Sequence, residues 1–517
     1  MSLWLLILIP ILAAPFAWMA QQQSCSAPRW VTIVALSVDG LLALFLGTGN
    51  HAVQASGHVA WLVESRVSWI PHWGISLHLG LDGFSLILIV LTAVVGVIAT
   101  MASWTEIQTR VGLFHCNVLL ALGGVIGVFL AIDLFLFFFF WELMLVPMYL
   151  LIVIWGHAQR RHASFKFFLF TQAGSLVLLV AIVALALLHQ QATGHPSFDY
   201  ADLMELTLSH EMARWLMAAF LIGFLVKLPA PPFHTWLPDT YTEAPTGATI
   251  ILAGILAKTG AYGLLRFTIP MFPEAMDEFM PIAMGLGVVG ILYAALLACA
   301  QTDIKRLVAY SSISHMGFIL LGTFAGTELA LQGVVMQMVA HGLSTGGLFL
   351  LAGALEERYQ TRDMTQMGGL WAVTPRLATM ALVFACATLG LPGMANFIGE
   401  FLILFGSYAT QPVMIILASL GMVMAAIYSL GMMQRTFFGR QQDTRSVSDL
   451  SNVAFGTVLL IAALQIWLGL YPRVVLSTAQ PVMNQLVQAA ALSPTMSHPP
   501  EASVLSSHLT TSQGSTP

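Results

Sequence analysis

The stretch VKLPAPPFHTWLPDTYTEAPTGATIILAGILAKTGAYGLLR, residues 226–266, decides the fold. It links the end of one apolar segment to a second, and each carries a lysine: Lys227 beside the link and Lys258 deep in the second segment. The prolines of LPAPP lack the N–H that would continue a helix. Unwound backbone at membrane depth must line a cavity or be covered by protein. The stretch therefore predicts a broken membrane-spanning helix inside a larger helical bundle.

The composition of the whole chain agrees with this prediction. Of the 517 residues, 58% are hydrophobic and 8% are charged, against roughly 25% charged in an ordinary soluble domain. Because a spanning helix needs about 20 apolar residues, the chain has room for roughly a dozen or more spans. A soluble globular enzyme is excluded. The sequence has no basic patch with interleaved aromatic residues, which excludes nucleic-acid binding.

Stretches without charge, bounded by charged or Pro/Gly-rich segments, predict an all-α polytopic membrane protein with about fourteen spans. The first could be a cleaved signal peptide, but its apolar run is long and has no basic residues before it, which favours a retained helix. The predicted spans are 3–20, 30–48, 79–103, 113–132, 134–154, 164–189, 212–228, 246–267, 280–300, 304–325, 328–354, 376–408, 413–437 and 452–471.

The positions of Lys and Arg predict the orientation. Loops after odd-numbered spans hold thirteen of the nineteen, and the other side holds four. The positive-inside rule then places both termini on the outer, periplasmic face of a bacterial inner membrane. From 493 the chain is rich in Ser, Thr and Pro, which predicts disorder. The organisation we expect is a three-helix segment 1–112, repeats 113–267 and 280–437, a C-terminal helix 438–475 and a disordered tail 476–517.

Four ionisable residues lie where the membrane should be. Glu142 and Lys258 fall near the midplane of their spans, and Lys227 and Glu400 flank the two predicted breaks. Each charge at a helix centre costs about 2.5 to 3.5 kcal/mol on insertion scales. The alternative to a functional role is that they form interhelical ion pairs that fix the packing. Such pairs seldom stabilise more than apolar residues would, so we favour a transport pathway.

Further polar residues accompany these four. His315 and His341 lie at similar depth, in KRLVAYSSISHMGF and VVMQMVAHGLSTGG, and His234 lies in the first break. Each is a candidate for proton transfer or a hydrogen-bonded packing residue. Asp133 is either a member of the pathway or an anion at a helix N-terminus.

A second break, LGLPGMANF at 389–397, precedes Glu400. It lies five spans after the first break, and an odd offset inverts the topology. Interrupted helices in corresponding positions are typical of inverted repeats in transporters. We therefore expect two inverted five-helix repeats, with Lys227 and Glu400 at equivalent sites.

The sequence predicts no bound cofactor or metal. The four cysteines are far apart and have no zinc or iron–sulfur ligand spacing. The glycine clusters follow no strand, so none predicts a nucleotide loop. Any redox chemistry, and any NADH binding, is expected on another chain.

Over about residues 80–475 the sequence resembles the antiporter-like membrane subunits of proton-pumping NADH-quinone oxidoreductase, respiratory complex I, and most closely their M type. The motifs that carry this resemblance are 226–266, FFFFWELMLVPMYLLI at 137–152, DIKRLVAYSSISHMGF at 303–318 and LPGMANFIGEF at 391–401. The resemblance implies a central proton path through Glu142, Lys227 and Lys258, and a twelfth-helix site that is Glu in the M type, here Glu400.

The resemblance also implies partners and a source of energy. The partners would be other membrane subunits of the complex, including sister antiporter-like subunits, together with membrane lipid. NADH and quinone would be used by the complex as a whole. We expect Glu142 to hold a proton on Lys227, and its release to pass through Lys258 and His315 or His341 to Glu400. A subunit of a multi-subunit sodium/proton antiporter and a scaffold without transport are the alternatives.

Overall fold

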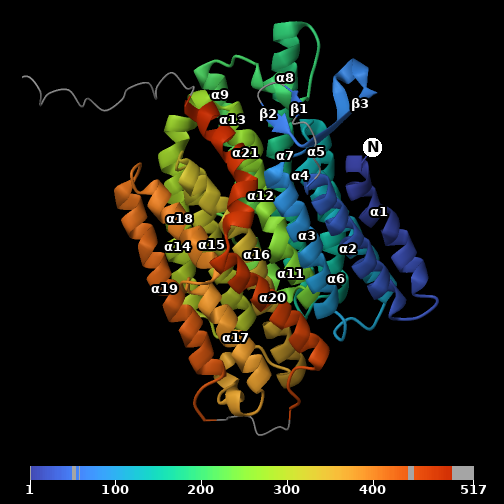
Figure 1. Cartoon of the computed structure of the whole chain (residues 1–517), viewed down its shortest axis with the longest axis vertical. Coiled ribbons are helices and arrows are strands. Elements are labelled where there is room, and N and C mark those ends of the chain that lie inside the picture. Colours follow the sequence, from blue (N-terminus) through green and yellow to red (C-terminus); the bar gives the residue numbers. More distant parts are fainter. Residues whose placement is uncertain (1, 49–53, 57–58, 441–446, 492–517) are drawn as a thin grey trace, which may run out of the picture.

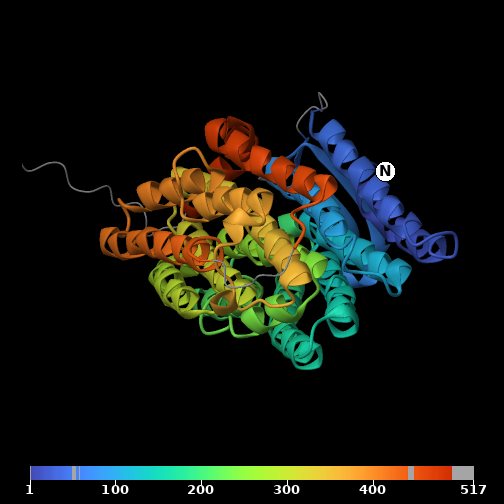
Figure 2. The same cartoon turned by 90° about the horizontal axis from the view of Figure 1, so that it is seen from below.

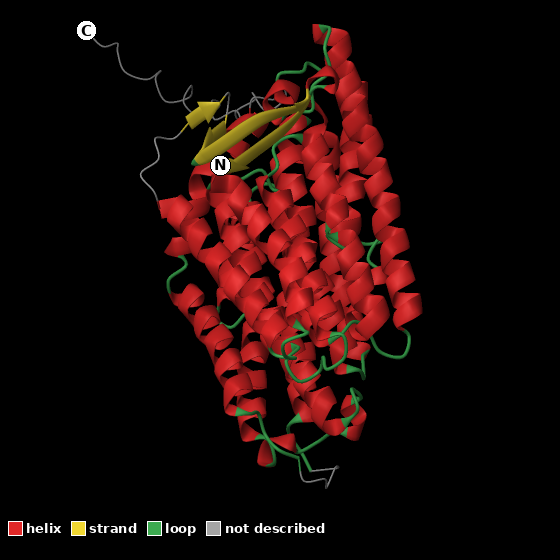
Figure 3. Ribbon diagram, turned by 90° about the vertical axis from the view of Figure 1, so that its right-hand side faces the viewer, coloured by secondary structure: helices red, strands yellow, loops and turns green. Residues whose placement is uncertain are grey.

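The computed structural model describes residues 2–48, 54–56, 59–440 and 447–491. Long helices run side by side in one bundle, and short strands lie at one end of it (Figures 1 and 3). Large apolar side chains cover much of the outer surface, including Leu41, Val180 and Val413, each at least 66% exposed. An apolar outer surface of this kind suits contact with lipid or with neighbouring membrane subunits.

Three helices form the N-terminal segment along one side of the bundle (Figure 2). Helix α1 packs against α2 and α4, and α2 packs against α3. Their bounds are α1 Ser2–Ala20, α2 Ala27–Thr48 and α3 Gly83–Ala102.

The next group contains the first broken helix, because α9 ends at Lys227 and α10 begins only after the proline-rich link. Its last span passes through two π-helical turns, η2 and η3. The bounds are α4 Val111–Leu130, α5 Leu134–Leu143, α6 Leu145–Trp155, α7 Arg160–Thr193, α8 Tyr200–Met204, α9 His210–Lys227, α10 Trp236–Glu243, α11 Thr246–Ile251, η2 Leu252–Leu256, α12 Ala257–Gly263, η3 Leu264–Thr268 and α13 Ile269–Met271.

The second group contains the second broken helix, α17 and α18. Helix α16 packs against α18, α15 and α11, so it connects the two groups. The bounds are η4 Pro273–Ala275, α14 Met276–Ala300, α15 Ile304–Thr323, α16 Glu328–Tyr359, η5 Met364–Gln366, η6 Leu370–Ala372, α17 Pro375–Thr388, α18 Ala395–Ser407, α19 Pro412–Thr436, α20 Asn452–Leu470 and α21 Arg473–Ala491.

Two antiparallel hairpins lie between α2 and α3, where the sequence predicted only a loop. They are formed by β1 Gln54–Ser56 with β2 Val59–Trp61, and by β3 Val63–Ile70 with β4 Ile75–Leu81. The second turns through η1, Pro71–Trp73, and Gly74, whose φ of 68° suits glycine. The end of the bundle that carries these strands and the N-terminus is called the hairpin end below (Figure 1).

The opposite end is called the basic-loop end. It carries the C-terminal end of α16, the start of α17, the end of α19 and the start of α20 (Figure 1). Lys305, Arg306, Arg362 and Arg376 lie there, at the ends of these and neighbouring helices or in the loops between them. The grouping of these cations agrees with the predicted asymmetry of charge.

Among the described residues, eleven helical segments are long and apolar enough to cross a membrane. This confirms a mostly helical, multi-pass membrane protein. The three other predicted spans fall on α9, on α15 and on the broken pair α17 and α18. Each of these is either too polar or too short in one piece to be recognised by length and composition alone.

The prediction of a disordered tail from 476 was wrong for residues 476–491, which belong to α21. Val475, Ala479, Val482, Met483 and Leu486 are buried at helical spacing. They lie on the side that packs across α3 and α16. The polar composition that suggested disorder belongs mainly to later residues, and 492–517 lie outside the described part of the chain.

Candidate functional site

Lys227 and Glu142 are close neighbours that do not form a direct ion pair in the described structure. Lys227 is 2% exposed at the C-terminal end of α9, and its Nζ lies 5.1 Å from the centre of the Trp141 ring and 5.9 Å from that of Phe167. Within the described chain, Nζ of Lys227 and Oε1 of Glu142 are buried without a hydrogen-bond partner. The charge of Glu142 acts on Lys227 through space, since it is near enough to couple electrostatically.

Lys258 contacts the second group of helices directly. Its Nζ donates to the carbonyl of Ala253, in the π-helical turn η2, and lies 2.7 Å from Nδ1 of His341 on α16. When Lys258 is protonated its ammonium has only donors, so Nδ1 then accepts and the ring proton of His341 lies on Nε2. No described atom forms a hydrogen bond with that Nε2.

Close glycine packing brings these two helices together. A Cβ on Gly342 would lie 2.8 Å from the carbonyl oxygen of Gly254, so the backbones of α16 and η2 touch there. Gly342 immediately follows His341, and Gly254 is four residues before Lys258. The contact between the lysine and the histidine therefore depends on the absence of a side chain at this crossing.

His315 and Glu400 continue the series. The rings of His341 and His315 are 5.7 Å apart between centroids, and Nδ1 of His315 is 2.8 Å from Oε1 of Glu400. The same carboxylate oxygen accepts from Nε2 of Gln337 at 3.0 Å, and the Tyr428 hydroxyl is 3.4 Å from Nε2 of His315. Gln337 and Tyr428 were not predicted, because an amide and a phenol in apolar helices gave no separate signal.

The second helix break shapes the surroundings of Glu400. Gly390 has a φ of 75°, which glycine adopts at little cost, and a Cβ there would lie 3.2 Å from Oε2 of Glu400. Helix α18 begins only at Ala395, so the backbone just before it is unwound. Oε2 of Glu400 has no hydrogen-bond partner in the described structure, although the residue is 1% exposed.

Four of the predicted residues thus form what is called the polar row below: Lys258, His341, His315 and Glu400. They come from α12, α16, α15 and α18, so the row crosses from one helical group to the other. Each is at most 2% exposed. In the row a donor faces an acceptor at both hydrogen-bonded steps, which is the arrangement that proton transfer requires.

His234 is not brought into the row. It lies in the first helix break, where its ring contacts Tyr293 edge to face at 5.4 Å, and its Nδ1 has no hydrogen-bond partner in the described chain. Asp133 caps α5, because its Oδ1 accepts from the N–H groups of Phe135 and Leu136. Of the two interpretations of Asp133, the structure favours the helix N-terminal anion.

A charged cluster at the basic-loop end was missed by the sequence analysis. Lys305 is fully buried, with its Nζ 2.6 Å from Oε2 of Glu356 and 3.2 Å from Nε2 of His157. Arg362 pairs with Glu243 at 3.4 Å and with Asp303 at 3.1 Å. These contacts join the ends of α6 and α10 to those of α15 and α16. Charges at loop ends are expected to be solvated, so the sequence alone gave no sign of their burial.

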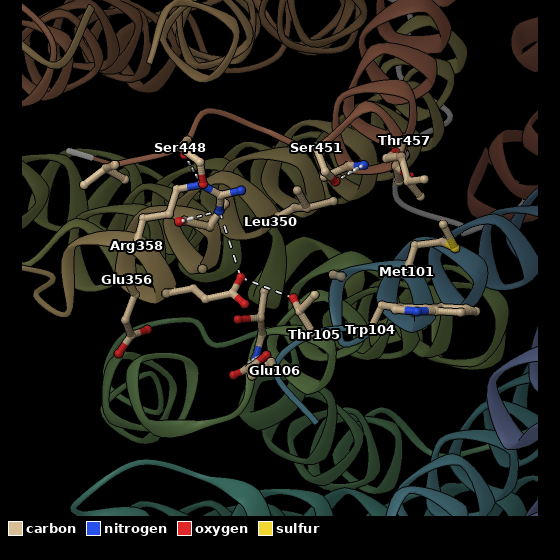
Figure 4. A pocket seen from close by; sticks show the side chains of 18 of the residues that line it. Met101, Trp104, Thr105, Glu106, Leu350, Glu356, Arg358, Ser448, Ser451 and Thr457 are labelled. Atoms are coloured by element: carbon tan, nitrogen blue, oxygen red, sulfur yellow. Dashed lines mark hydrogen bonds and ion pairs between the residues drawn. The ribbon is translucent and has the colours of Figure 1, made fainter. Parts of the chain in front are cut away.

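A cavity of about 1080 Å³ opens beside this cluster (Figure 4). Its lining includes Glu106 and Glu356, and Glu357 accepts there from the Thr105 hydroxyl at 3.2 Å. Burial raises the pKa of the Glu106 carboxyl, although the Lys305 charge and the hydrogen bonds from Thr246 act in the opposite direction. None of the seven predicted site residues is among the described residues that line this cavity.

The comparisons with known proteins agree with this fold and site. The family model described as "NADH:quinone oxidoreductase/Mrp antiporter, TM" matches residues 131–427, which include all seven predicted site residues. The chain therefore belongs to this family of antiporter-like transmembrane subunits.

Within the family, the chain is similar to NADH-quinone oxidoreductase subunit M of Pseudomonas aeruginosa. The two are 50% identical over 499 residues, which cover 94% of this chain and 98% of the relative. A chain of respiratory complex I from Thermus thermophilus with bound NADH superposes with a TM-score of 0.85 at 31% identity, covering 95% of this chain and 100% of the other. The Mrp complex from Dietzia sp. matches at 23% identity with a TM-score of 0.79, covering 95% of this chain and 52% of the other, and shows the fold alone.

Proposed function

We propose that the chain is the M-type, proton-translocating membrane subunit of a redox-driven NADH-quinone oxidoreductase in a bacterial inner membrane. The observation that carries this is the polar row, four titratable side chains in sequence across the interior of an apolar bundle. The similarity to subunit M over nearly the whole chain supports it. In this function the chain contributes to the enzyme as a non-redox subunit, and other membrane subunits are its partners.

Proton transfer along the row follows from its geometry. Nζ of Lys258 lies 2.7 Å from Nδ1 of His341, and Nδ1 of His315 lies 2.8 Å from Oε1 of Glu400, so a proton can pass within each hydrogen bond. Between the two imidazoles, where the centroid separation is 5.7 Å, transfer needs a rotated ring or a water molecule. A similar link is required from Lys227 to Lys258, because they share no hydrogen bond in the described structure.

Glu142 acts in this proposal as the switch at the start of the path. A carboxylate near Lys227 favours the protonated amine, and moving the two apart favours release of the proton in a low-dielectric interior. Moving one charge through 100 mV costs about 2.3 kcal/mol, so the energy must come from outside the chain. We assign its source to quinone reduction elsewhere in the complex, with NADH and quinone bound by other subunits.

The same proposal includes the number of spans, the inverted repeats and the orientation in the membrane. Fourteen spans would comprise the eleven apolar segments together with α9, α15 and the broken pair α17 and α18. The two breaks, one after Lys227 and one before Glu400, support two inverted five-helix repeats. Both termini would face the periplasm, which agrees with the cations gathered at the basic-loop end.

A sodium/proton antiporter subunit is the second candidate, because the description of the matching family model names both NADH:quinone oxidoreductases and Mrp antiporters. The chemistry of the row favours protons instead. Sodium ions take oxygen ligands, as other hard cations do, whereas the row presents an amine, two imidazoles and one carboxylate. His234, which lies apart from the row, would act in this proposal as an access residue in the first break.

The test uses the intact complex in proteoliposomes. In Lys258→Ala and Glu142→Ala complexes, NADH-driven proton uptake should fall at least about tenfold relative to electron transfer, since each loses a titrating group from the path. His115→Gln is the matched control, because His115 is equally buried but lies on α4 with no hydrogen-bond partner in the described chain. Wild-type proton uptake in an assembled Lys258→Ala complex would refute the proposal.

A further inference from the structure

A buried ion pair lies between the polar row and the hairpin end. Arg266 in η3 donates through Nη2 to Oδ2 of Asp82, the residue that caps α3, and the two side chains are 3% and 1% exposed. Neither belongs to the row, and neither was predicted as a site residue. Arg266 falls at the end of the predicted span 246–267 and is buried inside the protein.

Arg266 lies on the same helical segment as Lys258. The two are separated by eight residues, roughly 12 Å at 1.5 Å per residue. Tyr262 lies between them, and its hydroxyl accepts from Nε of Arg266 at 3.3 Å. Because α13 follows η3 at the hairpin end, the order from the row outward is Lys258, Tyr262, Arg266 (Figure 1).

Groups from β2, α3, α4 and α8 lie around the guanidinium of Arg266 and the hydroxyl of Tyr262. The ring of Trp61, from β2, lies 5.1 Å from the guanidinium carbon. The Tyr262 hydroxyl donates to the carbonyl of Phe129 on α4 at 3.0 Å and lies 3.2 Å from the hydroxyl of Ser85 on α3. Tyr200 of α8 is near enough to interact electrostatically with both Arg266 and Asp82.

An ion pair here has no clear advantage for stability. A buried pair seldom stabilises a protein more than apolar residues of similar volume, because both charges lose their hydration. An arginine in a proton pathway has a distinct property, since it stays charged and cannot pass a proton on. In pores, an arginine side chain excludes protons and other cations by its fixed charge.

We propose that Arg266 is a charge barrier that closes the polar row to the hairpin end, with the rings of Trp61 and Tyr262 packed against its guanidinium. The inference rests on the proposed function, because it assumes that the row carries protons. The carboxylate of Asp82 offsets the charge of Arg266 at the distance of Lys258, so the repulsion acts on a proton that comes close to the guanidinium. A proton that approached Arg266 more closely would be repelled more strongly. The barrier keeps protons in the row moving sideways to Glu400.

The experiment measures passive proton conductance, without NADH or quinone. Intact complex in liposomes is given a potassium diffusion potential with valinomycin, and an enclosed pH-sensitive dye reports proton entry. The double variant Asp82→Asn/Arg266→Gln removes both charges and leaves no unpaired ion. We expect it to leak about tenfold faster than wild type, because the barrier is gone. NADH-quinone electron transfer serves as the measure of assembly.

The single variant Asp82→Asn separates a barrier from a structural pair. Asn keeps the cap of α3 while Arg266 stays charged, so its leak should remain near that of wild type. Equal leaks in Asp82→Asn and in the double variant would overturn the proposal, and so would a double variant as tight as wild type. If the double variant does not assemble, Arg266→Gln takes its place, and its leak is compared with those of Asp82→Asn and wild type.

A third variant distinguishes this inference from the proposed function. Adding Lys258→Ala to the leaky double variant should return the leak to near wild type, because the leak passes through the row. If the leak persists, Arg266 closes a route other than the row. The proposed function is tested separately, by redox-driven proton uptake in the Lys258→Ala complex, where uptake as in wild type would refute it.

Discussion

The Nδ1 atom of His315 lies 2.8 Å from Oε1 of Glu400, across the contact between α15 and α18. Both residues are at most 2% exposed, and 84 residues separate them in the chain. A proton in this hydrogen bond can lie on the imidazole or on the carboxylate. The pair forms the end of the polar row that is opposite Lys258.

Glu400→Gln should stop proton transfer while keeping the fold. Glutamine retains an oxygen that can accept from His315 but has no titratable group. Redox-driven proton uptake in proteoliposomes should fall at least about tenfold at unchanged electron-transfer capacity. Glu328→Gln, at the start of α16, is the control and should pump normally. Normal pumping by Glu400→Gln would remove Glu400 from the path.

Gly342→Ala should separate α16 from η2. The new Cβ would be 2.8 Å from the carbonyl oxygen of Gly254, a distance that requires backbone movement. We expect a loss of stability of about 1 to 3 kcal/mol, together with a longer gap between Lys258 and His341 and slower pumping. Thermal unfolding and proton uptake measure the two effects.

The matched control for Gly342 is on the same helix, one turn further on. A Cβ at Gly346 would be 3.7 Å from a side-chain carbon of Ile250, which is an ordinary contact. Gly346→Ala should therefore leave stability and pumping close to wild type. Equal stability and pumping in the two variants would mean that the contact between the backbones of α16 and η2 does not set the distance between Lys258 and His341.

Glu356→Ala should destabilise the basic-loop end. It leaves Lys305 fully buried without its partner at 2.6 Å, and breaking a buried pair typically costs about 3 to 5 kcal/mol. Glu357→Ala removes a neighbouring carboxylate that is 49% exposed, so we expect about 0 to 1 kcal/mol. The melting temperature of the purified complex compares the two. Similar small shifts would show that solvent reaches Lys305.

The hairpin end should lose stability as the pH rises through the pKa of His78. Burial of His78 opposes its charged form, but the hydrogen bonds and charges of Asp199 and Glu64 outweigh this and raise the pKa of His78 above its ordinary 6.5. The protonated ring therefore stabilises the hairpin fully below pH 6.5, and this contribution is lost as the pH rises through the raised value. Hydrogen exchange in β3 and β4, corrected for its intrinsic pH dependence, should show this loss.

Asp199 sets the acid limit of the same contact. Although burial acts against it, the partnership with His78 and the charge of Arg66 lower the pKa of Asp199 below 3.8. Its contribution is present above pH 3.8 and is lost as the pH falls through the lowered value. His78→Gln should abolish the loss of protection with rising pH. A variant that loses protection with rising pH as the wild type does would contradict the assignment to His78.

Much of the architecture follows from local properties of the chain. Uncharged runs indicated the spans, the prolines before His234 and the glycines near Pro392 predicted the two breaks, and the rarity of charge made Glu142 and Lys258 stand out. Local properties did not predict the hairpins, because their short strands need partners across the turn. They did not predict α21 either, because its apolar side is buried only by packing on α3 and α16.

The sequence by itself determined that titratable groups lie inside an apolar helical bundle, because charge and helical spacing are read residue by residue. The tertiary structure alone decided which groups meet. Helical periodicity sets the depth of a residue in its own span but not which helix packs beside it, so His315 and His234 looked alike in sequence. Helix packing placed His315 between His341 and Glu400 and left His234 against Tyr293.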